Sequence, residues 1–158
     1  MKRTLLLGAF VSALLIGFVS CKKCTVAEED TISGIIIPNT IVYAMPGYLT
    51  RDHPINVWNG QQYDGFGYNF EISIDEGVTR IPVDYDAYTI LANPMYVNCK
   101  ASFEKSVTRD DINNIVRYKI TATTCKSCEQ ERYVENYILV PDIPSNYTVV
   151  IEKVINVN

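Results

Sequence analysis

The sequence predicts an all-β fold, an antiparallel β-sandwich that forms one domain. From Thr31 onward, short runs of β-branched and aromatic residues alternate with Pro, Gly, Asn and Asp, which is typical of strands joined by turns. No segment repeats apolar residues at the helical period over three turns. The 158 residues are enough for one domain, and a hydrophobic content of 47% supplies a core that needs no metal or dense disulfides.

The expected strands are too many for one small sheet, which favours two packed sheets. In chain order they are Ile32–Ile37, Thr40–Met45, Ile55–Trp58, Phe66–Ile74, Val78–Val83, Tyr88–Ala92, Tyr96–Phe103, Ile115–Thr123, Tyr133–Val140 and Tyr147–Ile155.

Alternation within two of these strands predicts one buried face each. One face of the fourth strand carries Phe66, Tyr68, Phe70, Ile72 and Ile74. In the strand that starts at Ile115, the apolar face carries Val116, Tyr118, Ile120 and Ala122, opposite Ile115, Arg117, Lys119 and Thr121.

Turn residues separate the strands at the expected places. Asp75-Glu76-Gly77 lies between two alternating runs and indicates a hairpin, and Asn93-Pro94 indicates a bend. The polar segment Thr108–Asn114 is expected to form a single helical turn, because Thr108 is a good N-cap and Asp110 and Asp111 would lie in its first turn.

The N-terminus predicts export. Lys2 and Arg3 precede the uncharged apolar stretch Thr4–Val19, which matches the basic start and short hydrophobic segment of a secretory signal. That stretch is about 16 residues, shorter than the roughly 20 that cross a bilayer core. The segment Phe18-Val19-Ser20-Cys21 resembles a bacterial lipobox, with Ser20 and Phe18 where Gly or Ala and Leu are usual.

The lipobox resemblance implies that residues 1–20 are a signal peptide and that Cys21 is lipidated. Residues 21–30 would then form a tether, and residues 31–158 the β domain. Two or three acyl chains on Cys21 would hold the protein on a membrane without spanning it. Ser20-Cys21-Lys22-Lys23-Cys24 is similar to lipoproteins of the Bacteroidota, and Lys22 favours the outer membrane. The acidic run Glu28-Glu29-Asp30 is interpreted either as a cell-surface export signal or as a solvated linker, so the periplasmic and surface faces both stay open.

The β domain resembles immunoglobulin-like and transthyretin-like sandwiches. The segment Asp84-Tyr85-Asp86-Ala87-Tyr88 before an apolar strand is similar to a tyrosine corner, with Tyr88 as the candidate tyrosine. Immunoglobulin domains have a cysteine two residues after this tyrosine, where this chain has Ile90. The similarity therefore supports the architecture and identifies no family.

Four cysteines remain when Cys21 is lipidated. In an exported protein we expect a structural disulfide from Cys99 to either Cys125 or Cys128, with Cys24, beside the anchor, unpaired with the core in at least part of the population. Cys125-Lys126-Ser127-Cys128 also fits a redox pair or half of a zinc site, whose other ligands would be His53 and another cysteine. The sequence predicts neither a metal nor a cofactor.

Aromatic residues between positions 43 and 70 include the candidate binding residues. Tyr and Trp are frequent at recognition surfaces and equally frequent in a sandwich core, and both interpretations stay open. The candidates are Tyr48, Trp58, Tyr63, Phe66 and Tyr68.

These features predict a non-enzymatic, lipid-anchored protein of the cell envelope that binds an envelope protein or glycan or serves a structural role. A net charge of -4 without a long Lys/Arg run argues against nucleic acid as a partner. His53 is the one histidine, and no Gly-x-Ser-x-Gly nucleophile motif is present. The alternatives are a redox or metal-dependent accessory protein that uses Cys125 and Cys128, and a protease-inhibitor-like envelope module.

Overall fold

The computed structural model describes Val26 and residues 29–44, 57–58, 70–74, 77, 79–98, 100–125 and 131–157. These residues form twelve strands and no helix. The prediction of an all-β, sandwich-like fold is therefore confirmed. The strands are β1 (Thr31–Gly34), β2 (Ile41–Ala44), β3 (Val57–Trp58), β4 (Phe70–Ser73), β5 (Ile81–Pro82), β6 (Tyr88–Ala92), β7 (Met95–Asn98), β8 (Ala101–Asp110), β9 (Ile115–Thr124), β10 (Glu131–Val134), β11 (Tyr137–Pro141) and β12 (Thr148–Val157).

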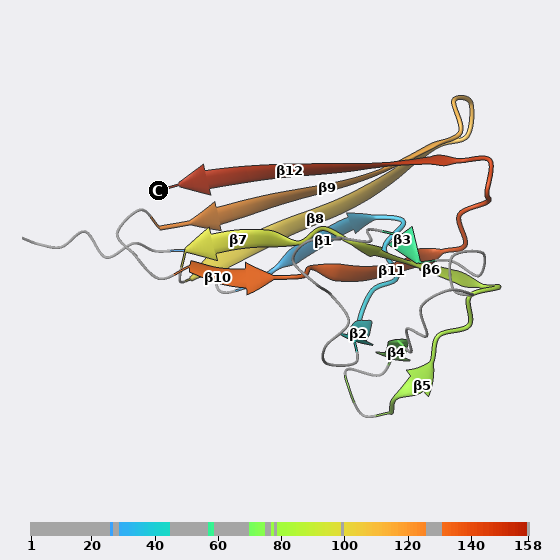
Figure 1. The fold of residues 1–158 in the computed structure, drawn as a ribbon, viewed down its shortest axis with the longest axis horizontal. Helices are drawn as coiled ribbons and strands as arrows, with labels where there is room; N and C mark the ends of the chain where they lie inside the picture. Colours follow the sequence, from blue (N-terminus) through green and yellow to red (C-terminus); the bar gives the residue numbers. More distant parts are fainter. Residues whose placement is uncertain are drawn as a thin grey trace, which may run out of the picture.

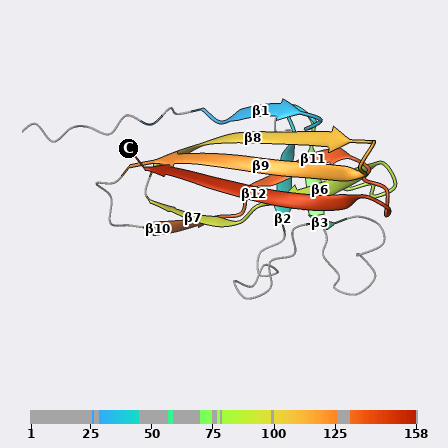
Figure 2. The same ribbon diagram turned by 90° about the horizontal axis from the view of Figure 1, so that it is seen from above.

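The largest sheet has the strand order β1-β8-β9-β12 and forms one layer of the molecule (Figures 1 and 2). Its centre is the antiparallel hairpin β8–β9, in which Ala101 pairs with Thr124 and Asp110 with Ile115. Both outer strands pair in parallel, β1 with β8 and β12 with β9. The sheet is therefore mixed, whereas the sequence predicts antiparallel pairing throughout.

A second layer lies against this sheet and contains two antiparallel ladders, β6–β11 and β7–β10 (Figure 1). The last pair of the β6–β11 ladder is Ala92 with Tyr137, and the first pair of the β7–β10 ladder is Met95 with Val134. The two ladders therefore share one register. The strands are interrupted at Asn93-Pro94 and at Glu135-Asn136. Pro94 has no N–H for a ladder hydrogen bond, and Asn136 has a φ of 52°.

Two buried asparagines bridge this interruption and connect it to the four-stranded sheet. Asn136 Nδ2 donates to the Asn93 carbonyl oxygen at 3.3 Å, and Asn93 Nδ2 donates to the Glu152 carbonyl oxygen of β12 at 2.9 Å. From β9, the buried Tyr118 hydroxyl donates to the Asn136 carbonyl oxygen at 3.0 Å. Burial of the Tyr118 phenol raises its pKa above the ordinary value, so the hydroxyl stays a donor.

The main core lies between the four-stranded sheet and the second layer. The face that carries Val116, Tyr118, Ile120 and Ala122 is fully buried, as the alternation in the sequence predicts. It packs with Leu91, Val97, Ile138 and Val140 of the second layer. A smaller apolar cluster joins Phe70 and Ile72 of β4 to β6 and β11. This cluster holds the small sheet β2-β4-β5 against the second layer.

Two predicted strands are each divided into two. Tyr96–Phe103 is β7 followed by β8, because the chain passes from the second layer to the large sheet between Asn98 and Ala101. Tyr133–Val140 is β10 followed by β11, divided at the asparagine interruption. Within the strand predicted over Phe66–Ile74, Phe70 and Ile72 are buried, while Ile74 is 46% exposed beyond the end of β4.

The helical turn predicted over Thr108–Asn114 is wrong. β8 continues to Asp110, and a tight turn over residues 111–114 leads into β9. Asp110 Oδ1 accepts hydrogen bonds from the backbone N–H groups of Ile112 and Asn113, both at 3.0 Å. A side chain that caps a helix also closes such a turn, and Asn114, with a φ of 52°, turns the chain back into β9.

Two other local predictions have mixed outcomes. The hairpin predicted at Gly77 joins β4 to β5, and Gly77 has a φ of 95°. The segment before Tyr88 is a turn, in which Ala87 N and Tyr88 N both donate to the Asp84 carbonyl oxygen. Among the described residues the Tyr88 hydroxyl has no hydrogen-bond partner, so the tyrosine corner predicted there is absent from this part of the chain.

Candidate functional site

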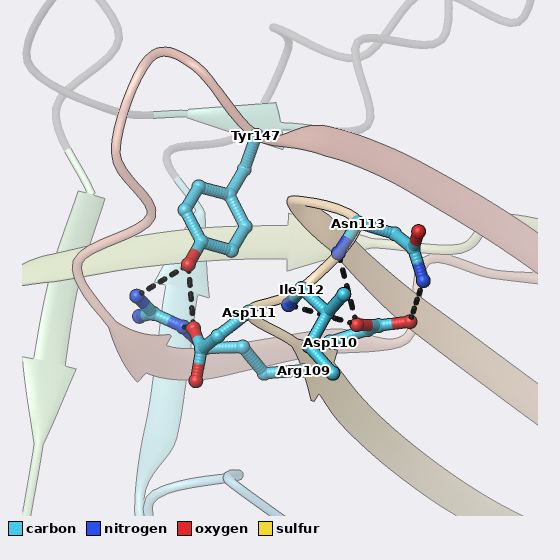
Figure 3. A network of polar contacts seen from close by, with 6 residues as sticks. All are labelled: Arg109, Asp110, Asp111, Ile112, Asn113 and Tyr147. Atoms are coloured by element: carbon cyan, nitrogen blue, oxygen red, sulfur yellow. Dashed lines mark hydrogen bonds and ion pairs between the residues drawn. The ribbon is translucent and has the colours of Figure 1, made fainter.

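The tip of the β8–β9 hairpin carries a network of polar side chains (Figure 3). Arg109 is the penultimate residue of β8, Asp111 lies in the turn, and Tyr147 comes from the segment that leads into β12. Thr148 N donates to the Asn114 carbonyl oxygen at 2.8 Å, which fixes this segment beside the turn. Residues far apart in the sequence therefore meet at one end of the large sheet.

Each polar group of this network bonds to the other two. Arg109 Nε donates to Asp111 Oδ1 at 2.6 Å, and Arg109 Nη2 donates to the Tyr147 hydroxyl oxygen at 3.1 Å. The Tyr147 hydroxyl in turn donates to Asp111 Oδ1 at 2.5 Å. The Arg109 guanidinium also lies 4.5 Å from the centre of the Tyr147 ring, a favourable cation–π distance.

These contacts shift the ionisation of both carboxylates at the tip. The hydrogen bond from Tyr147 and then that from Arg109 lower the pKa of Asp111. The side-chain hydrogen bond from Asn113 lowers the pKa of Asp110. The hydrogen bond to Asp111 raises the pKa of Arg109. All three groups are therefore held in their charged forms at neutral pH.

The ionisable groups of the tip are charged at neutral pH and lie beside one exposed apolar side chain. General acid–base catalysis needs a group whose pKa lies near the operating pH, and the shifts here move away from neutrality. The side chain of Ile112 is 93% exposed at the apex of the turn. The tip therefore presents one exposed apolar side chain beside charged groups that hydrogen bonds hold in place.

A second feature is a cavity of about 230 Å³ between β1, β2 and β11. Its walls are mostly apolar, with Ile36, Ile41 and Leu139 among them, and Lys105 contributes a cation. Lys105 Nζ pairs with Asp30 Oδ2 at 3.1 Å. The cavity is small for a ligand site, and its charged group already has a partner.

Most of the site residues predicted from the sequence lie outside the described residues. This is true of Cys21, Cys24, Tyr48, His53, Tyr63, Phe66, Tyr68, Cys99 and Cys128. The backbone of Trp58 pairs with Ile90 in β3, while its side chain is not described. Cys125 is 7% exposed at the end of β9 and is disulfide-bonded, with a partner outside the described residues.

No metal centre is found among the residues that the structure describes, where no three His, Cys, Asp or Glu side chains lie close enough to share an ion. The closely spaced carboxylates of two turns have local roles. Asp84 Oδ1 accepts from Asp86 N at 3.0 Å, and Asp110 closes the hairpin turn.

No family model, curated protein or solved structure matches the chain. Among the described residues, no helix has the length and apolar character needed to cross a membrane.

Sequence reasoning did not identify the Arg109–Asp111–Tyr147 network. Arg109 and Asp111 flank Asp110 in a segment read as a helical turn, and Tyr147 lies 36 residues beyond Asp111. The sequence feature that could have predicted this turn is Asp-Asp-Ile-Asn-Asn at 110–114, because Asp and Asn residues favour a turn as well as a helix start. The parallel placement of β12, which brings Tyr147 to the tip, has no local sequence feature.

Proposed function

We propose that this chain is a non-enzymatic binding module of the cell envelope, anchored by lipid on Cys21 and presented on the outer membrane. The lipobox resemblance supports the anchor, and residues 21–30 would form the tether. An alternative use of Cys125 and Cys128 has less support. For metal binding, a disulfide-bonded Cys125 has no thiolate to offer, and for redox chemistry the 7% exposure of Cys125 gives a second thiol little access.

The observation that carries this proposal is the direction of β1 relative to the hairpin tip. Thr31, the first residue of β1, pairs with Glu104 of β8, and β8 then runs six residues further to Asp110. At about 3.4 Å per residue, the tip lies roughly 20 Å beyond the point where the tether would enter. The β8–β9 turn, which carries Ile112 and the Arg109–Asp111–Tyr147 network, thus lies beyond the end of β1 and away from its first residue (Figure 1).

The anchor is tested in the native bacterium or in a bacterial host with lipoprotein processing enzymes. Cells that express the full chain are fed a labelled fatty acid, and membranes are separated from soluble protein. We expect label and membrane association for the wild type and for Cys24→Ala, and neither for Cys21→Ala, because two or three acyl chains are needed for stable anchoring. Membrane association of Cys21→Ala equal to that of the wild type would contradict the anchor.

Binding at the distal tip is tested with a photo-crosslinking amino acid at position 112 of the full chain in intact cells. The same amino acid at exposed Arg132 is the matched control, since β10 lies at the other end of the domain. We expect a discrete crosslinked species from position 112 and none from position 132. Equal crosslinking at both positions would exclude the tip as the contact surface.

A further inference from the structure

The strand β12 is ten residues long, and among the described residues no other strand pairs with its outer edge (Figure 2). Thr148 N bonds to Asn114 O toward β9, and in a parallel pair successive residues point their backbone groups to opposite sides. The N–H and C=O groups that point away from β9 therefore belong to Val149, Ile151, Lys153, Ile155 and Val157. Within the described part of the chain, no group hydrogen-bonds to this side of the strand.

In the second half of β12, side chains on the core-facing side of the sheet are also exposed. The side chains of the same alternate residues point to the face of the sheet that carries Tyr118 and Ile120. Val149 and Ile151 pack partly against the core, whereas Lys153 is exposed, Ile155 is 45% exposed and Val157 is 54% exposed. A strand added beside β12 would cover these three side chains and pair with the free backbone groups.

The charges at the centre of β12 disfavour pairing with a second copy. Residues directly opposite in an antiparallel pair point to the same face of the sheet. When two copies of β12 pair around a twofold axis, the axis must therefore pass beside one residue, which lies opposite the same residue of the other copy. The two longest such registers centre on Glu152 and on Lys153. The first register places Glu152 opposite Glu152 of the second copy, and the second places Lys153 opposite Lys153. Like charges directly opposite each other are destabilising.

The same lysine favours a particular kind of foreign strand. Among the described residues Lys153 has no carboxylate within ion-pair distance, and Ile151 and Ile155 flank it on the same face. We infer that the β12 edge binds an extended segment of another protein that places an acidic side chain opposite Lys153, with apolar side chains two positions before and after it. This inference rests on the proposed binding function and names the class of partner and its contact strand.

The test uses the full chain in detergent and two synthetic peptides. The acidic probe is Thr-Thr-Val-Thr-Glu-Thr-Val-Thr-Thr, and the control probe has Lys in place of Glu. We expect the acidic probe to bind about fivefold more tightly, which is the upper range for one cross-strand charge pair. It should also slow hydrogen exchange of the outward amides of residues 151, 153, 155 and 157. Lys153→Glu should reverse the order of the two probes, whereas Lys119→Glu, the same charge change on the other face of the sheet, should keep it.

Equal binding of the two probes to the wild type, or bound acidic probe without protection of these amides, would overturn the inference. A concentration-dependent dimer of the wild type that protects the same amides would also overturn it, by showing that a second copy is the occupant. Lys153→Val should instead form such a dimer, because the register centred on residue 153 then pairs valine with valine. Crosslinking from position 112 does not depend on Lys153. If the peptide test fails while this crosslinking persists in Lys153→Glu, only the inference about the β12 edge is wrong, and the proposed binding function stands.

Discussion

The two edges of the four-stranded sheet end in different ways. β1 is four residues long and covers only residues 104–107 of β8, yet side-chain contacts and a close backbone approach fix it there. β12 pairs with β9 over all ten residues, and no strand in the described part of the chain pairs with its other side. Both are terminal strands of the sheet, so the difference is one of length. The short strand leaves few backbone groups unpaired on its outer side, whereas among the described residues the long strand leaves a longer row of them.

The largest expected effect is at Gly34 in the short edge strand β1. Gly34 has a φ of 82°, and a Cβ there would lie 1.9 Å from the Val107 carbonyl oxygen, which is backbone and cannot rotate away. Gly34→Ala should lower the free energy of unfolding by about 4 kcal/mol, because the left-handed conformation and the overlap both cost energy. Urea denaturation measures this loss. Ser33→Ala, at the neighbouring exposed position, is the control and should change stability little.

A second effect concerns the start of β8, which precedes the residues that pair with β1. The Thr124 hydroxyl donates to the carbonyl oxygens of Asn98 at 2.7 Å and Lys100 at 3.3 Å, the two residues that flank Cys99 in the sequence. Thr124 immediately precedes disulfide-bonded Cys125, so of the two predicted partners for Cys99 this arrangement favours Cys125. Cys99→Ser should lower the free energy of unfolding by about 3 kcal/mol in oxidising buffer and have little effect in reducing buffer.

Thermal unfolding with and without reductant measures the effect of Cys99→Ser. Cys24→Ser and Cys128→Ser are the controls and should leave the melting temperature unchanged. Peptide mass mapping that finds Cys99 as a free thiol would refute this pairing.

A smaller effect is expected from Asp30, which holds the beginning of β1. Its Oδ1 accepts from Phe103 N and its Oδ2 from Lys105 Nζ, both at 3.1 Å. Asp30→Ala should lower the free energy of unfolding by about 1 kcal/mol, because one hydrogen bond and a partly exposed ion pair are lost. Amide hydrogen exchange of residues 31–34 should accelerate more than that of β12. Glu29→Ala, an exposed neighbour, serves as the control, and equal exchange in the two variants would count against this role of Asp30.

The smallest effect lies at the tip, where Tyr147 precedes β12. The pKa of Asp111 is lowered from its ordinary value of 3.8, chiefly by the Tyr147 hydroxyl. Its stabilising contribution is therefore present above 3.8 and disappears as the pH falls through the lower folded-state value. In an NMR titration, Tyr147→Phe should raise the midpoint of the Asp111 carboxylate toward 3.8, whereas Asn113→Ala should affect Asp110 instead. A midpoint that does not move would show that the network is absent in solution.

Sequence reasoning succeeded where structure follows local periodicity. The buried face of β9, from Val116 to Ala122, needs only two-residue alternation, and the hairpin at Gly77 needs only its turn residues. It failed where the determinant is distant in sequence. The parallel pairing of β1 and β12 depends on which strand each meets after a long connection, and the Arg109–Tyr147 contact depends on that pairing.

Some errors came from residues that support two local structures. Asp110 and Asn113 suit a helix start and a tight turn equally well, and the length of β8 decides between them. For the candidate site, Cys125 is the only predicted side chain whose burial is described, and the aromatic candidates stay predictions.

The interruption in the second layer makes the lengths of two strands depend on each other. Asn93-Pro94 and Glu135-Asn136 remove the same number of residues from opposite sides of one ladder, so the register on the two sides remains the same. Losing one residue from only one side would turn every following side chain of that strand to the other face and expose Met95 and Val97. Chains that share this fold are therefore expected to change length at both positions together or at neither, and alignments should show paired insertions there.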